Sequence, residues 1–155
     1  MLDIEKTIRE YLPQVVHMSL ATCRDNHPWV CEVHFAYDDE LNLYFRSTLN
    51  RRHSQELLEN PCVSGNIITQ HFLNQKVRGV YFEGTAKLIE SDEELNIAFN
   101  AIKERLHLDE EILVDAHKED GHKFFKLSVT NFYLFDSYTS NPSQKYQLEW
   151  SKRAL

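Results

Sequence analysis

The feature that most constrains the fold is a series of strand-like segments joined by very short polar turns. Residues 15–23, 28–37 and 41–48 have strand-like patterns, and the second and third alternate along their length. Only residues 24–27 and 38–40 separate these segments. Connections this short join antiparallel neighbours, because a parallel crossover needs a dozen or more residues. The first half of the chain therefore predicts an antiparallel meander.

The remaining segments add a few helices and more strands. The expected helices are residues 4–12, ended by Pro13, residues 51–59, capped by Asn50, a helix opened by Ser91, and a short piece over 109–117. The expected strands are residues 62–69, 77–89 and 123–136, and residues 137–155 are read as a polar tail. The sequence predicts one domain over residues 1–155, mainly β with a few peripheral helices, whose six strands close on one another to remove their edges.

Composition excludes several classes of function. Lys and Arg number 17 against 24 Asp and Glu, a formal charge of −7, which does not suit a protein that neutralises nucleic-acid phosphates. The start has no signal-peptide pattern, and no apolar run approaches the ~20 residues of a membrane span. Three widely spaced cysteines are typical of reduced thiols. We therefore expect a cytoplasmic protein that binds neither membranes nor nucleic acid.

The densest positive cluster lies where the third strand leads into a helix. Arg46 is on the strand, and Arg51, Arg52 and His53 open the helix. A helix N-terminus attracts anions through its free N–H groups, so a phosphate there would offset the unfavourable placement of cations in the first turn. Ser47 and Thr48 could donate hydroxyl protons to the same group. The alternative is that the arginines are solvated surface charges.

The order of short motifs resembles that of the pyridoxamine 5′-phosphate oxidase-like family, the FMN-binding split barrels. The resemblance is carried by Ala21-Thr22, His27-Pro28-Trp29, Asp38-Asp39, Leu43-Tyr44-Phe45-Arg46-Ser47, Arg52-His53, Glu59-Asn60-Pro61-Cys62-Val63 and the segment from Arg78 to Ala86. It implies a six-stranded antiparallel split β-barrel and a homodimer with FMN at the subunit interface.

The resemblance also implies roles for individual residues. Arg46 and Ser47 would line the ribityl-phosphate side of the flavin, and Arg52 and His53 would hold the phosphate, with the Thr48 hydroxyl close by. Val33 and His34 fall where the family's second strand runs beside the flavin ring. The implied activity is that of an FMN-dependent oxidoreductase whose substrate and catalytic residues the sequence does not identify.

Two alternative functions stay open. The first is a non-catalytic module that holds flavin or haem on the same split barrel. The second, more distant, is an oligonucleotide-binding barrel.

Two positions depart from the family pattern. His53 stands where the family usually has Lys, so we expect phosphate affinity to fall as the pH rises from about 6 to 8 and the imidazole loses its charge. The Arg- and His-containing C-terminal signature of true pyridoxamine-phosphate oxidases is matched only faintly, by Trp150 and Arg153. Pyridoxamine phosphate is therefore not the expected substrate.

Histidines and cysteines are numerous enough to raise the question of a metal site. Cys31 and His34 are the closest such pair, but an odd separation on a strand sends their side chains to opposite faces. His117 and His122 flank a loop that contains a glycine and have no evident partners. We predict no metal site.

Overall fold

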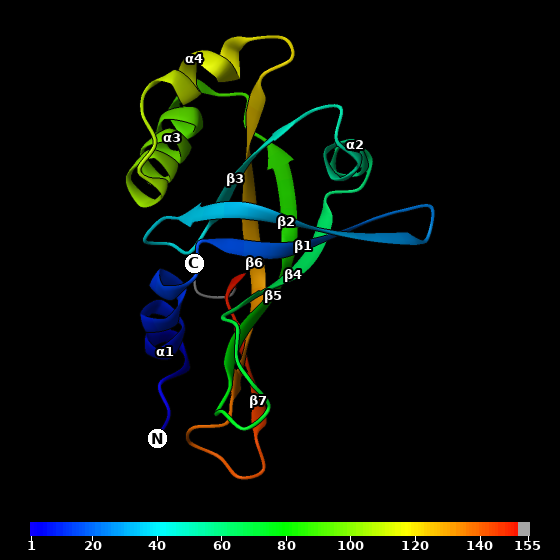
Figure 1. The fold of residues 1–155 in the computed structure, drawn as a ribbon. Coiled ribbons are helices and arrows are strands. Elements are labelled where there is room, and N and C mark those ends of the chain that lie inside the picture. Colours follow the sequence, from blue (N-terminus) through cyan, green and yellow to red (C-terminus); the bar gives the residue numbers. More distant parts are fainter. Residues whose placement is uncertain (152–155) are drawn as a thin grey trace.

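The computed structural model describes residues 1–151, so Arg153 of the C-terminal comparison lies outside the described residues. Four helices and seven strands follow one another along the chain (Figure 1). They are α1 Ile4–Tyr11, a 3₁₀ turn Leu12–Gln14, β1 His17–Arg24, β2 His27–Tyr37, β3 Leu43–Thr48, α2 Arg52–Glu59, β4 Cys62–Ile68, β5 Arg78–Leu88, α3 Asp92–Leu106, α4 Glu111–His117, β6 His122–Asp136 and β7 Gln144–Glu149.

Six of the strands form a closed antiparallel ring. Strand β1 pairs with β2 and β4, β2 pairs with β3, and β4 pairs with β5. Strand β6 then closes the ring, because it pairs with both β5 and β3. The predicted class, mainly β with six antiparallel strands and a few peripheral helices, is confirmed.

Strand β6 has 15 residues, whereas β3 and β7 have 6 each, so one edge of β6 is long enough to pair with both. Residues His122 to Leu127 of β6 pair with β3, whereas Asn131 to Asp136 pair with β7. The two partners therefore share one edge of β6, one after the other. This arrangement divides the sheet into an upper ring and a lower ribbon. In Figure 1 the ribbon consists of the lower parts of β5 and β6 with β7 beside them.

Strand β7 corrects the prediction of a polar tail without regular structure. Its residues alternate only weakly, with Tyr146 and Leu148 as the apolar members, so local pattern did not reveal a strand. Leu148 joins the main core opposite Phe132, and the following Trp150 ring packs edge-on against Phe132 at 5.9 Å. Pairing with the exposed edge of β6, rather than propensity, makes this segment a strand.

Alternation along the strands separates two cores. On β3, Leu43 and Phe45 point into the main core inside the ring, and Phe45 stacks on Phe125 with ring centroids 5.0 Å apart. Tyr44, between them, faces the second core with Phe99 and other residues of α3. Arg46 lies on the same outer face of β3 as Tyr44, so the helices α3 and α4 that cover this face determine its surroundings.

Helices α1 and α3 begin at side-chain caps, whereas the predicted Asn50 cap of α2 is wrong. The N-cap residue of α2 is Arg51, and Asn50 Oδ1 instead accepts from the Thr48 hydroxyl. The Asp3 side chain accepts a hydrogen bond from the Lys6 N–H at 3.0 Å, and Ser91 accepts one from Glu94 N–H at 3.2 Å. Both caps agree with the predicted starts of α1 and α3. No helix in residues 1–151 is both long and apolar enough to cross a membrane.

Candidate functional site

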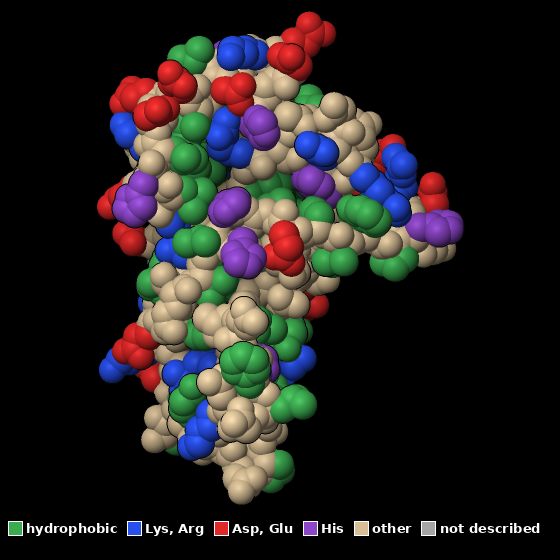
Figure 2. Space-filling view, in the orientation of Figure 1, with side chains coloured by type: hydrophobic (Ala, Val, Ile, Leu, Met, Phe, Trp, Pro, Cys, Tyr) green, Lys and Arg blue, Asp and Glu red, His purple; other side chains and the backbone are tan. Residues whose placement is uncertain are grey.

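A large pocket lies beside β2 and β3, between α2 on one side and the C-terminal end of α3 on the other. Its volume is about 940 Å³, within the range of pockets that hold cofactors. Figure 2 shows histidine and arginine or lysine side chains gathered between these helices. The pocket is lined by Val16, Trp29, Cys31, Glu32, Val33, His34, Arg46, Ser47, Thr48, Arg51, Arg52, His53, Ile102, Arg105, Leu106, His107, Leu108 and His122.

All seven residues that the sequence predicted for the site line this one pocket. Val33 is buried against the main core, whereas its neighbour His34 is exposed beside His17, with ring centroids 6.4 Å apart. The Thr48 hydroxyl donates to Asn50 Oδ1 at 2.6 Å, within the turn that leads to α2. The structure thus brings the predicted residues together.

The corner between β3 and α2 joins two buried polar side chains. Ser47 Oγ and His53 Nε2 are hydrogen-bonded at 2.7 Å. The Arg51 side chain does not cap α2, so the first N–H groups of the helix have no side-chain acceptor. Burial lowers the pKa of His53, the charge of Arg51 lowers it further, and Glu56 only partly opposes them. His53 is therefore neutral near pH 7, and it loses its charge at a lower pH than the sequence alone predicted.

Arg52 lies at the pocket but already has a carboxylate partner. Its Nε donates to Glu56 Oε1 at 2.7 Å, and its guanidinium lies 4.4 Å from the ring centroid of Trp29. Glu56 is only 1% exposed and also accepts from Thr22 Oγ1 at 2.5 Å. Burial would raise the pKa of Glu56, but the hydrogen bonds from Thr22 and Arg52 and the nearby arginine charges lower it overall. The Glu56 carboxylate therefore stays charged and fixes Arg52 at the pocket wall.

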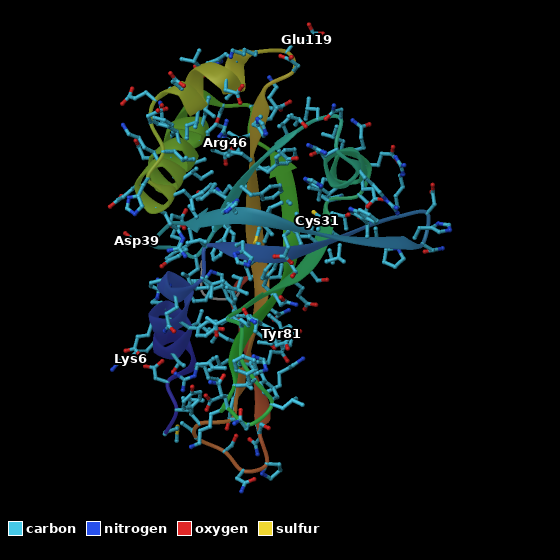
Figure 3. All side chains as sticks on the ribbon, in the orientation of Figure 1. Lys6, Cys31, Asp39, Arg46, Tyr81 and Glu119 are labelled. Atoms are coloured by element: carbon cyan, nitrogen blue, oxygen red, sulfur yellow. The ribbon has the colours of Figure 1, made fainter. Side chains whose placement is uncertain are left out.

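Arg46 is paired in a similar way, but with a residue distant in sequence. Its Nη2 donates to Asp115 Oδ2 of α4 at 2.9 Å, and its guanidinium lies 5.3 Å from the centroid of Phe124 (Figure 3). The buried Nε of Arg46 has no hydrogen-bond partner among the described residues. The Arg46 side chain thus keeps one unused donor at the pocket.

His122 also contacts Asp115, a hydrogen-bond partner that the sequence did not reveal. Its backbone N–H and its ring Nδ1 lie 3.0 and 3.1 Å from Asp115 Oδ2. The hydrogen bond from the His122 backbone lowers the pKa of Asp115 most. The His122 side chain and the charge of Arg46 lower it further, and these effects together outweigh burial, which raises it. One carboxylate therefore holds a cation of β3 and the start of β6 together.

Arg105, at the end of α3, is the main residue that the sequence reading missed. Its Nε donates to the Phe35 carbonyl at 3.2 Å, and its Nη2 donates to the carbonyls of Leu12, at 2.8 Å, and Val15. The guanidinium also lies 5.0 Å from the ring centroid of Phe35 and 4.8 Å from that of Tyr37. A signal was available, because Arg105 follows Ile102 by three positions and so borders the apolar stripe of the helix.

The other reactive side chains of the pocket do not assemble a nucleophile. Burial, with help from Glu32 and Glu56, raises the pKa of Cys31 to about 11, so its thiol stays protonated. The Ser47–His53 pair has no carboxylate on the imidazole among the hydrogen bonds of the described residues, where Glu56 is used by Thr22 and Arg52. Residues 1–151 also contain no cluster of three or more His, Cys, Asp or Glu arranged for a metal ion. The arginine side chains of the pocket would attract an anionic group.

The family model of pyridoxamine 5′-phosphate oxidase matches residues 4–136 of the chain. Among curated proteins, none was found that matches the sequence.

Several solved structures share the fold at low identity. HutZ, the haem storage protein of Vibrio cholerae, superposes with a TM-score of 0.69 at 24% identity, covering 87% of this chain and 95% of HutZ. A haem-binding protein of Mycobacterium smegmatis gives 0.72 at 17%, covering 90% of this chain and 55% of that one. A NimC/NimA family protein of Clostridium acetobutylicum gives 0.61 at 18%, covering 92% and 91%. At these identities the likeness concerns the fold alone.

Proposed function

Because the chain belongs to the pyridoxamine 5′-phosphate oxidase family, we propose that its pocket binds FMN, with the phosphate at the first turn of α2. The observation that carries this proposal is the uncapped α2 N-terminus beside the Ser47–His53 pair. Free backbone N–H groups, a helix dipole and a hydroxyl converge there, which is the chemistry of an anion site.

The residues at this corner fit a phosphate group. Arg51 and Arg52 supply positive charge, and the unpartnered Nε of Arg46 is a donor in need of an acceptor. Each hydrogen bond between a charged donor and a phosphate oxygen contributes about 1.5–3 kcal/mol. Neutral His53 would act as a hydrogen-bond partner of Ser47 rather than as a cation, so the arginines carry the charge of the site.

The rest of the pocket wall would orient the flavin ring. Val33 and His34 of β2 lie between the α2 corner and the end of α3, with Trp29 near Arg52. FMN, when bound, would supply hydride or electron transfer, so the protein needs only to position the ring and its substrate. The apolar side chains of the wall would exclude water from the ring. We assign no general base to the protein.

Haem binding is the second candidate, because four histidines, His34, His53, His107 and His122, line the same pocket. Imidazole is a common axial ligand of haem iron. Two of the solved structures with this fold are described as haem-binding or haem-storage proteins. On this alternative the pocket would hold haem for storage rather than perform flavin chemistry.

We further propose that the protein is a homodimer whose partner subunit completes the pocket. Val16, Trp29 and Leu108 are large apolar side chains that remain exposed although they line the pocket. A second subunit packed over the pocket would bury these side chains. Light scattering after size-exclusion chromatography should give twice the chain mass, whereas a monomer at micromolar concentration would contradict this proposal.

A titration of the purified protein with FMN, and separately with haem, tests the proposed function. We expect FMN binding, and we expect Arg52→Ala to raise the Kd about 10- to 100-fold, the equivalent of one or two lost charged hydrogen bonds. Arg24→Ala is the matched control, because Arg24 also pairs with a carboxylate of α2, Glu59, but does not line the pocket. Failure to bind FMN, combined with a haem absorbance band, would replace the first candidate with the second.

A further inference from the structure

Arg105 differs from the paired arginines of the pocket in having no counter-charge. Arg46 and Arg52 each form an ion pair with a carboxylate. The hydrogen bonds of Arg105 all go to backbone carbonyls, and the ion pairs of the described residues do not include it. Carbonyl dipoles hold the guanidinium in place, but they do not cancel its charge.

A half-buried cation without a counter-charge is unfavourable unless something compensates it. Burial lowers the pKa of Arg105, and only Tyr37 acts in the opposite direction. Nε and Nη2 of Arg105 are used by the three carbonyls, and Nη1 is the nitrogen for which the described residues provide no acceptor. The side chain is therefore fixed by three bonds and keeps Nη1 to donate a charge-assisted hydrogen bond to one oxygen of a carboxylate.

The surroundings of Arg105 indicate what kind of ligand fits. Ile102, Leu106 and Leu108 provide an apolar wall, and His107 adopts a left-handed conformation with φ of 54° at the end of α3. Glu32 is the only carboxylate among the described residues that line the pocket. One uncompensated positive charge beside apolar side chains matches a monoanion with an apolar body better than a dianionic phosphate.

We propose that Arg105 forms a second anion subsite, at the α3 end of the pocket, for the carboxylate of a small apolar or aromatic acid. The subsite lies across β2 and β3 from the α2 corner, where the phosphate of FMN is proposed to bind. It does not depend on the flavin, because Arg105 is held by the protein's own carbonyls. In a flavin-loaded protein it would orient an acidic substrate from the opposite side of the pocket.

The direct test compares benzoate with benzamide, which is similar in shape but uncharged. We expect benzoate to bind the purified protein at least 10-fold more tightly in isothermal titration calorimetry. In ¹⁵N NMR of the unmodified protein, benzoate should shift the Arg105 side-chain resonance, and benzamide should leave it in place. Equal affinity for the two probes, or no response of Arg105 to benzoate, would overturn the proposal.

Variants then identify the residue responsible. Arg105→Gln should remove the preference for benzoate, while Lys103→Gln, on the same helix but paired with Glu110 outside the pocket, should keep it. A preference that survives in Arg105→Gln and disappears in Arg52→Ala would place the carboxylate at α2 and refute the subsite. Thermal melts report whether each variant is folded, and the NMR measurement remains decisive if Arg105→Gln is not.

The outcome is separable from that of the flavin proposal. FMN affinity should change by less than twofold in Arg105→Gln, and benzoate should still bind after saturation with FMN. If FMN does not bind at all, the benzoate measurements still report on Arg105. If benzoate instead displaces FMN in strict competition, the two subsites are one and the proposal is wrong.

Discussion

The two ends of the pocket hold their arginines by different means. At the α2 end, Arg52 is paired with Glu56 on the next turn of its own helix, whereas Arg105, at the α3 end, is held by carbonyls of two separate segments, the turn at Leu12 to Val15 and strand β2. A carboxylate holds a guanidinium in place and also neutralises its charge, whereas a carbonyl holds the guanidinium in place and leaves most of its charge uncompensated. The α2 end is therefore the more stabilising corner, and the α3 end keeps the greater unmet attraction for an anion.

The largest expected effect is at the buried carboxylate of the α2 end. Glu56→Ala removes the acceptor of both Thr22 and Arg52, so the free energy of unfolding should fall by about 3 kcal/mol. Chemical denaturation measures the change. Glu59→Ala is the control, because the Glu59 pair with Arg24 is largely exposed and should contribute less than about 1 kcal/mol. Equal losses in the two variants would show that burial of Glu56 does not strengthen its bonds.

A smaller effect is expected at Asp115, which holds a cation from a distant strand. Asp115→Asn keeps the size of the side chain but removes its charge, so the contacts with Arg46 and His122 weaken. We expect a loss of about 1–2 kcal/mol in the free energy of unfolding. A loss as large as that of Glu56→Ala would mean that pairing across the fold stabilises this pocket as much as pairing within one helix.

The smallest effect is the pH dependence contributed by His53. Its pKa is lowered in the folded state, chiefly by burial, so the unfolded chain binds its proton first as the pH falls. Below about pH 6.5, the ordinary pKa of histidine, His53 therefore lowers the free energy of unfolding as the pH falls. Above that pH it adds no pH dependence to the stability. Thermal melts of the unmodified protein and of His53→Gln, compared across pH 5 to 8, measure this. A parallel pH profile in His53→Gln would contradict the assignment.

Local pattern was sufficient where the relevant partners are near in sequence. The alternation of β3 and the start of α2 grouped Arg46, Ser47, Thr48, Arg52 and His53, and the family resemblance added Val33 and His34. All seven line one pocket. The Arg52–Glu56 pair, whose members are four positions apart on one helix, was also within reach of the sequence. By contrast, β7 and the Asp115 partner of Arg46 escaped prediction, because each depends on an element far away along the chain.

What the sequence by itself determined is the order of strands and turns and the outward placement of Arg46 on β3, since a period of two assigns each side chain to a face. What only the tertiary structure decided is which groups meet those side chains. Closing the ring through β6 and laying α3 and α4 over it brought Asp115 to Arg46 and three carbonyls to Arg105. Such contacts join residues tens of positions apart, and packing between whole elements, rather than local preference, selects them.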